Sequence, residues 1–275
     1  MPYVRARDHA RIFYRVRGPI DGEQLVLVMG LGWDMTGWQL LIPRLNRYRV
    51  LRLDNRGTGR SDKPDRPYSI RQMAGDVIRC MNDAGFDSAQ VYGASLGSMI
   101  AQELALSYPA RVRALVLGCP SPGVLMIPGS PGIVRVMLAS RGLEPEEAFR
   151  RVAPYLYAAS LVERPEAIEE VFQRRMASNV SPIGFRRQLE AVFRWSSLSR
   201  LSQISVPTLV IHGDSDRLIP PANGRLIARL VRGARLVLLK GAGHVYGTDR
   251  PVEHLEALLG WLEEHSLSSK LAAAG

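Results

Sequence analysis

Short apolar runs, each bounded by Gly, Asp or a polar segment, recur along the chain. Most are continuous and rich in Val, Leu and Ile, which is typical of parallel strands buried on both faces of a sheet. Two further strands are expected around a turn at Asp8-His9. The predicted strands lie at residues 3–7, 11–17, 25–29, 50–53, 91–92, 114–117, 208–211 and 236–239.

Segments with apolar residues at helical spacing lie between these runs. In the clearest of them Ile70, Met73 and Val77 recur on one face, Ser69 is the expected N-cap and Gly85 ends the helix. Alternating strands and helices predict an α/β fold, with a mostly parallel central sheet and helices on both faces. Other helices are predicted around residues 100–106, 227–231 and 255–262.

Residues 121–200 break this alternation because they contain no strand-like run. The segment begins rich in Pro and Gly and then becomes helical and amphipathic, which predicts a helical cap inserted between two strands. The α/β core is therefore expected at residues 1–120 and 201–269. Residues 270–275 resemble a tail added by a cloning vector, and we leave them out of the fold prediction.

A candidate nucleophile lies in Gly93-Ala-Ser-Leu-Gly97, between a predicted strand and a predicted helix. This is the context that the G-x-S-x-G nucleophile elbow requires. A serine on so tight a turn adopts a strained backbone, and glycines two residues before and after it avoid a collision. Ser95 is the predicted nucleophile, and the alternative is a serine in an ordinary Gly-rich turn.

A general base for Ser95 is expected among five histidines. His244 follows the last predicted strand, in a Gly-rich segment that allows the imidazole to turn back toward the serine. His9 lies in a surface turn, and His254 and His265 lie on the last helix, so solvated or structural roles are expected for these three. His212 ends a strand and is predicted to be a packed structural histidine.

A carboxylate is expected to hold the imidazole in the correct tautomer. Asp214 and Asp216 both follow the penultimate strand, and Asp216 lies farther into the loop. Asp214 is expected to bond the backbone of its own loop, and Asp249 is expected to cap the final helix. The order Ser95, Asp216, His244 is the chain order known for a serine triad on an α/β sheet.

An oxyanion hole is expected beside the serine. Met29-Gly-Leu-Gly-Trp33 follows the first long apolar run and can aim a backbone amide at a carbonyl oxygen. The predicted donors are the backbone N–H groups of Leu31 and Leu96. The alternative is an ordinary turn at the end of a strand.

These motifs together resemble the α/β-hydrolase family over nearly the whole chain, and most closely its bacterial carboxylesterases with their enol-lactonase-like and haloperoxidase-like relatives. The family carries its acid three residues after the glycine of a His-Gly pair, so the resemblance selects Asp216. It often has His where this chain has Met29, which leaves the backbone amides in place. The motifs are at residues 30–33, 54–62, 93–97, 212–216 and 243–244.

The resemblance and the triad predict a serine esterase that forms an acyl-enzyme on Ser95. Alternatives with the same triad are C–C bond hydrolysis, enol-lactone opening and perhydrolysis, and a non-catalytic small-molecule receptor is a further one. No metal and no organic cofactor is expected, since the chain has no G-x-G-x-x-G or Walker-type loop. Ser at position 95 argues against the alkyl-enzyme route of relatives that carry Asp there.

Charge and composition add little to this prediction. The formal net charge is +10, but the basic residues are scattered and only three are Lys, so no nucleic-acid partner is expected. No apolar segment has the pattern of a signal peptide or a membrane span, which predicts a cytoplasmic protein without membrane contact. Cys80 and Cys119 are expected to be small buried hydrophobes.

Apolar residues of the insertion are candidates for a substrate pocket, together with Trp33 near its mouth. Packing within the insertion explains the same residues equally well, so both interpretations stay open. The candidates in the insertion are Leu125, Met126, Ile127, Met137, Leu138, Phe193 and Trp195.

Overall fold

The computed structural model describes residues 3–124, 126–140, 142–178 and 181–267, and in them eight strands form one sheet. The strand order is β1-β2-β4-β3-β5-β6-β7-β8. Only the β1–β2 and β2–β4 pairs are antiparallel, so the predicted α/β fold with a mostly parallel sheet is confirmed. The strands are β1 (Tyr3–Arg5), β2 (Arg11–Arg17), β3 (Glu23–Val28), β4 (Tyr48–Leu53), β5 (Ala89–Ala94), β6 (Val112–Gly118), β7 (Thr208–Gly213) and β8 (Arg235–Leu239).

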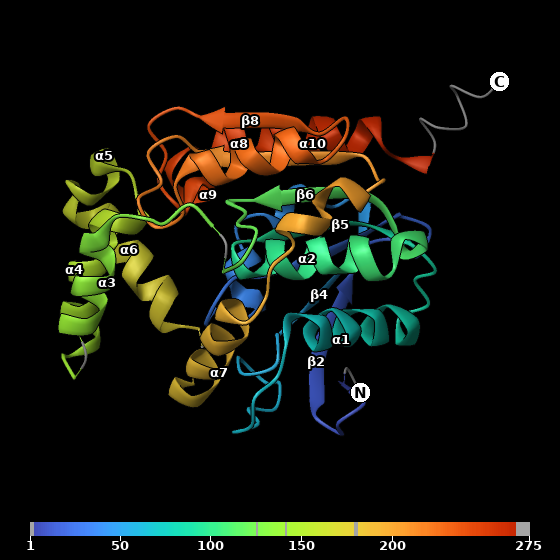
Figure 1. Cartoon of the computed structure of the whole chain (residues 1–275), viewed down its shortest axis with the longest axis horizontal. Coiled ribbons are helices and arrows are strands. Elements are labelled where there is room, and N and C mark those ends of the chain that lie inside the picture. Colours follow the sequence, from blue (N-terminus) through green and yellow to red (C-terminus); the bar gives the residue numbers. More distant parts are fainter. Residues whose placement is uncertain (1–2, 125, 141, 179–180, 268–275) are drawn as a thin grey trace.

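Parallel pairing brings the carboxyl ends of four central strands to one edge of the sheet. Val28 of β3 is in register with Gly93 of β5, Gly93 with Leu117 of β6, and Leu117 with Val210 of β7. In Figure 1 the arrows of β6 and β8 point toward the side of the molecule where the helices α3 to α6 lie. Loops that follow these strands therefore meet at the edge where ligands bind in sheets of this kind.

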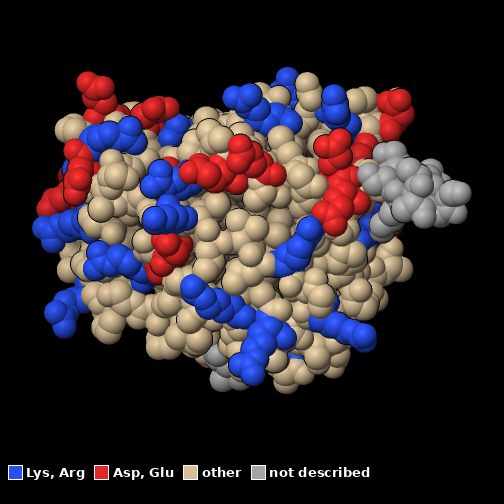
Figure 2. Space-filling model, turned by 90° about the horizontal axis from the view of Figure 1, so that it is seen from above, with Lys and Arg blue, Asp and Glu red and all other residues tan. Residues whose placement is uncertain are grey.

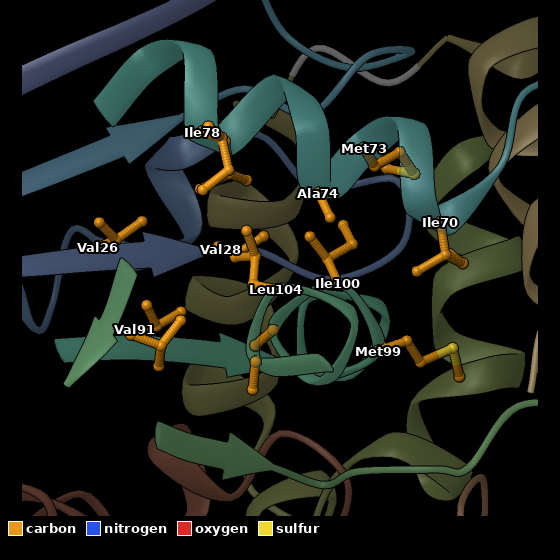
Figure 3. Close-up of a cluster of buried hydrophobic side chains, with 14 of the residues drawn as sticks. Val26, Val28, Ile70, Met73, Ala74, Ile78, Val91, Met99, Ile100 and Leu104 are labelled. Atoms are coloured by element: carbon orange, nitrogen blue, oxygen red, sulfur yellow. The ribbon is translucent and has the colours of Figure 1, made fainter. Parts of the chain in front are cut away.

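Side chains of each strand alternate between two helix-covered faces. Val26 and Val28 belong to a buried cluster with residues of α1, α2 and α8 on one face, whereas Leu25 and Leu27 belong to a second cluster with residues of α10 and a short 3-10 turn on the other. Figure 3 shows Val26, Val28 and Val91 facing apolar residues of α1 and α2. The helices of the core are α1 (Ile70–Asp83), α2 (Leu96–Ser107), α8 (Pro221–Leu230), α9 (Tyr246–Asp249) and α10 (Pro251–Glu264), and the 3-10 turns are η1 (Met35–Trp38), η2 (Ile42–Arg44), η3 (Pro109–Arg111) and η4 (Leu198–Gln203).

The start of α1 is the predicted one. Ser69 Oγ accepts from the Gln72 backbone N–H, and the Gln72 side chain accepts from the Ser69 N–H. This reciprocal capping box satisfies two backbone donors that a helix start otherwise leaves open.

Five helices form the insertion between β6 and β7, which we call the cap. Its entry and exit are fastened together, because Val124 N donates to Trp195 O at 2.8 Å and Ser197 N to Pro122 O at 3.0 Å. The cap lies beside the carboxyl edge of the sheet (Figure 1). Its helices are α3 (Pro131–Ala139), α4 (Pro145–Leu156), α5 (Ala159–Val162), α6 (Pro165–Met176) and α7 (Pro182–Phe193).

The surface carries charges of both signs. Figure 2 shows Lys and Arg interspersed with Asp and Glu on the face that it presents, without a continuous basic band. None of the helices in the described ranges has the length and apolar character needed to cross a bilayer. The proposed tail at residues 270–275 lies outside the described residues.

Candidate active site

Ser95 occupies the tight turn between β5 and α2. Its backbone is in the left-handed half of conformational space, with φ 55° and ψ −119°. The two glycines of the motif are required by close backbone contacts: a Cβ at Gly93 would lie 2.1 Å from Gly97 O, and one at Gly97 would lie 2.0 Å from Val28 O. Ser95 N donates to Gly118 O at 2.8 Å, so the neighbouring strand also holds the turn.

The structure brings Ser95, His244 and Asp216 together in one hydrogen-bonded chain. His244 Nε2 lies 3.0 Å from Ser95 Oγ, and His244 Nδ1 lies 2.7 Å from Asp216 Oδ2. The second carboxylate oxygen, Oδ1, accepts from the backbone N–H groups of Leu218 and Ile219, both at 2.9 Å. Both oxygens of the buried carboxylate therefore have hydrogen-bond partners that fix its orientation.

The charges of this chain shift the pKa values of both titratable partners. Burial alone would raise the pKa of Asp216, but His244 and His212 outweigh it and lower that pKa to about 2. For His244, burial opposes the charged imidazolium, and the Asp216 carboxylate overcomes this and raises the pKa of His244 well above its ordinary value. The carboxylate therefore stabilises the protonated imidazolium form of His244.

His212 is buried, as predicted, and it also contacts the acid. Its Nε2 lies 2.8 Å from Ile219 O and 3.3 Å from Asp216 Oδ2. The residue thus supports the Asp216 loop. The sequence contains a signal for this contact, because His212 and Asp216 are only four residues apart and are separated by the turn that follows β7.

Asp214 differs from the prediction in its partner. Its Oδ1 accepts from Gly241 N at 2.7 Å, in the loop that carries His244, and from the adjacent Ser215 hydroxyl at 2.9 Å, rather than from the backbone of its own loop. A separate loop can supply this donor because β7 and β8 are parallel neighbours and end side by side. Asp214 therefore ties the two loops together at their base.

The prediction that Asp249 caps the final helix is wrong. Asp249 ends α9, and its Oδ2 accepts from Gly243 N at 2.7 Å and from Ala158 N in the cap at 3.0 Å. Burial raises the pKa of Asp249, although these two hydrogen bonds oppose the rise. The helix α10 begins with Pro251, which has no backbone N–H, so one donor fewer requires a cap. The Asp249 carboxylate instead accepts from the two backbone donors outside α10.

The turn after β3 lies directly against the serine. A Cβ at Gly30 would lie 3.2 Å from Ser95 Cβ, so a side chain at this position would crowd the serine. The backbone N–H groups of Leu31 and Leu96 donate to no other group within the described residues. At Met29, where relatives often carry His, the carbonyl oxygen accepts from Asn55 Nδ2 at 2.8 Å.

Cys119 is buried as predicted, but it lies at the candidate site. It follows β6, has φ 38°, and places Sγ 3.8 Å from His244 Nε2. The sequence held a signal for this, since Cys119 is the first residue after the strand that pairs with the nucleophile strand.

The three principal pocket candidates have different surroundings. Trp33 lies beneath the Arg175 guanidinium, 4.7 Å from the ring centroid. Trp195 is buried against α2, where its Nε1 donates to Glu103 at 2.8 Å. Met126 contacts Ser121 Oγ through its sulfur.

Of the remaining pocket candidates, Ile127 and Phe193 are exposed, with 59% of Phe193 accessible. Leu125 lies outside the described residues, as do the side chains of Met137 and Leu138. Within the described ranges, no three His, Cys, Asp or Glu side chains are grouped to hold a metal ion.

A serine after β5, a carboxylate after β7 and a histidine after β8 of a mostly parallel eight-stranded sheet are the arrangement typical of an α/β-hydrolase. The chain matches the family model for the alpha/beta hydrolase fold over residues 23–251, and it belongs to this family. It is 32% identical to the poly(3-hydroxyalkanoate) depolymerase of Ectopseudomonas oleovorans, over 81% of this chain and 78% of that protein.

Two further relatives extend this comparison. The pimeloyl-[acyl-carrier protein] methyl ester esterase of Aeromonas hydrophila is 27% identical, over 86% of this chain and 94% of that protein. The crystal structure of the enol-lactonase from Burkholderia xenovorans LB400 superposes with a TM-score of 0.83 at 28% identity, covering 96% of this chain and 100% of that one. The protein is therefore a hydrolase whose relatives include esterases and an enol-lactonase.

Proposed function

We propose that the protein cleaves small-molecule carboxylic esters through an acyl-enzyme on Ser95, with His244 as general base and Asp216 as its orienting acid. The observation that carries the proposal is the unbroken chain of contacts, 3.0 Å from Ser95 Oγ to His244 Nε2 and 2.7 Å from His244 Nδ1 to Asp216 Oδ2. Both distances are within hydrogen-bond reach, so His244 can take the proton of Ser95 while Asp216 orients the imidazole.

Acylation starts when His244 Nε2 takes the proton of Ser95 Oγ as that oxygen attacks the ester carbonyl carbon. The carbonyl oxygen becomes an oxyanion, and the Leu31 and Leu96 N–H groups donate to it. The C–O bond to the alcohol then breaks, the leaving oxygen takes the proton from His244, and the acyl group stays on Ser95.

Deacylation repeats these steps with water. His244 takes a proton from a water molecule as the water oxygen attacks the acyl carbon. The bond between the acyl carbon and Ser95 Oγ then breaks, and His244 returns the proton to Oγ. The products are an alcohol and a carboxylic acid. Asp216 stays ionised throughout and stabilises the imidazolium that forms in each half.

Lactone opening is the second candidate, and the similarity to the enol-lactonase structure over the full length of that chain favours it. It uses the same steps, but the alcohol remains attached to the acyl group. C–C hydrolysis, perhydrolysis and a receptor role are left as outcomes of the test, because no single contact in the site favours any of them.

The test is hydrolysis of p-nitrophenyl esters of increasing acyl length by the wild type, Ser95→Ala and Ser107→Ala. Ser107 is the matched control, since it lies at the far end of α2 and bonds only Glu103. We expect Ser95→Ala to lose about 10⁴-fold or more of kcat, and Ser107→Ala to keep the wild-type value. Absence of ester turnover by the wild type would contradict the proposal, and lactone, diketone and peroxide substrates would then separate the alternatives.

A further inference from the structure

The turn that carries Leu31 is held on both sides by side chains from the cap. Gly32 N donates to Gln188 Oε1 of α7 at 2.9 Å, and Gly32 O accepts from Arg175 Nη1 of α6 at 2.9 Å. A third contact lies two residues farther along the chain, where Asp34 N donates to Ser178 Oγ at 3.2 Å. We call residues 29–33 the oxyanion loop.

The conformation of the oxyanion loop explains why it needs such anchors. Trp33 N donates to Gly30 O at 3.3 Å, so residues 30–33 form a β-turn, and its third residue, Gly32, has φ 67°. Positive φ at this place is the conformation of a type II turn, which differs from type I by a flip of the central peptide. Glycine occupies either form at little cost, so the turn alone does not fix the orientation of the Leu31–Gly32 peptide.

Gln188 is itself rigidly held. It is fully buried, and its Nε2 donates to Arg56 O at 2.8 Å. The Arg56 guanidinium is anchored in turn by Asp76 at 2.6 Å and Asp8 at 3.0 Å.

The helix that carries Gln188 is docked by a backbone contact as well. A Cβ at Gly184, near the start of α7, would lie 1.9 Å from Gly57 O in the loop after β4. This approach leaves α7 little freedom to slide, so the Gln188 amide is presented to the oxyanion loop from a fixed support.

We propose that Gln188 is a positioning residue of the oxyanion hole. By accepting the Gly32 N–H it fixes the peptide group that directly follows Leu31. The Leu31 residue is thereby held in place, and with it the N–H that donates to the substrate carbonyl oxygen. Gln188 touches no reacting atom and acts through the turn. The inference rests on the proposed ester hydrolysis, and it assigns to a cap helix part of the transition-state stabilisation.

The experiment compares Gln188→Met with Gln90→Met. Gln90 is an equally buried glutamine whose Nε2 donates to a backbone oxygen, Leu262 O, at 2.9 Å, but it lies at the opposite end of β5 from Ser95. We would measure kcat, KM and the Ki of an aryl trifluoromethyl ketone, whose adduct with a catalytic serine carries the oxyanion.

We expect Gln188→Met to lower kcat about 10- to 100-fold. This is at most the decrease in kcat that follows removal of one oxyanion-hole donor. KM should change less than threefold, and the Ki of the ketone should rise by the factor by which kcat/KM falls. Gln90→Met should leave all three constants within about twofold while lowering Tm comparably, because it removes a similar buried hydrogen bond.

Two further variants keep the test decisive if Gln188→Met does not fold. Gln188→Glu retains an acceptor for Gly32 N and should keep kcat within about fivefold of the wild type, whereas Gln188→Asn, which is one methylene too short to reach, should lose it. The inference is overturned if kcat and Ki follow Gln90→Met, or if the loss falls on KM alone. A wild type that neither hydrolyses esters nor binds the ketone would instead overturn the proposed function, and the inference with it.

Discussion

The core and the cap hold the candidate site in different ways. In the core, reactive side chains stand on loops that pack backbone against backbone: a Cβ at Gly213 would lie 2.2 Å from Gly243 O, as one at Gly97 would collide with β3. In the cap, side chains reach out to the backbone of the site loops, as Gln188 and Arg175 do. Backbone packing fixes where the reacting atoms are, and the cap adjusts the loops around them.

The outer surface of the cap differs again. Its helices pair Arg150 with Glu146, Arg151 with Glu147 and Arg174 with Glu170 along their exposed sides. Such pairs gain little from each other in water. The cap is therefore expected to contribute to the site through a few inward residues and to tolerate change outside them.

The largest effect is expected at the core acid. Asp216→Asn should lower kcat by about 10⁴-fold, because the amide favours the wrong tautomer of His244. The matched control is Asp214→Asn, two residues away, which should stay within about tenfold because Asp214 bonds Gly241 N and Ser215 Oγ and does not contact His244 in the described residues. Equal losses in the two variants would show that loop stability, rather than the tautomer, sets the rate.

The pH dependence of activity tests the direction in which Asp216 shifts the pKa of His244. Only neutral His244 accepts the serine proton, so activity should fall as the pH drops through the His244 pKa, which Asp216 raises. Without the carboxylate, burial is opposed by less charge, and the pKa of His244 should be lower than in the wild type. The acid limb of kcat/KM in Asp216→Asn should thus move to lower pH, and an unmoved limb would assign it to another group.

The next largest effect is on folding. Gly97→Ala should destabilise the protein by more than about 4 kcal/mol, since its Cβ would meet backbone atoms that cannot move aside. Gly260→Ala in α10, with nothing within 4 Å of the added atom, should stabilise by about 0.5–1 kcal/mol. Urea denaturation measures the free energy of unfolding of both variants. A loss of stability in Gly97→Ala well below the expected value would weaken the contrast between core and cap.

A smaller effect is expected where core and cap meet. Asp249→Ala removes the acceptor shared by Gly243 N and Ala158 N, and we expect kcat to fall about tenfold because a charge-assisted hydrogen bond contributes about 1.5–3 kcal/mol. Asp249→Asn keeps one acceptor oxygen and should recover most of the rate. Steady-state kinetics beside Tm values decides this, and a loss of Tm with unchanged kcat would limit Asp249 to a structural role.

The smallest effect is expected on the outer cap. Arg150→Ala removes two partly exposed ion pairs, with Glu146 at 2.8 Å and Glu169 at 3.1 Å. It should change the free energy of unfolding by less than about 1 kcal/mol and leave kcat/KM unchanged. A larger loss in urea denaturation would mean that the cap surface shares the tight coupling of the core.

Sequence reasoning was strongest where chemistry follows a strand end. The fold follows from apolar periodicity, and Ser95, Asp216 and His244 could be named because each stands just after a predicted strand. Asp249 and Gln188 could not be placed this way, because each bonds a backbone N–H far away in sequence, Ala158 N for Asp249 and Gly32 N for Gln188. Their side chains are ordinary polar groups of helices until the cap is folded against the core.

The hydrogen bonds that join Pro122 with Ser197 and Val124 with Trp195 have a consequence for engineering. They set the distance between the two ends of the insertion independently of what lies between them, and loop closure depends only weakly on the length of the closed segment. This junction is a natural graft point: a cap of another length and sequence can be exchanged there while the sheet keeps its register.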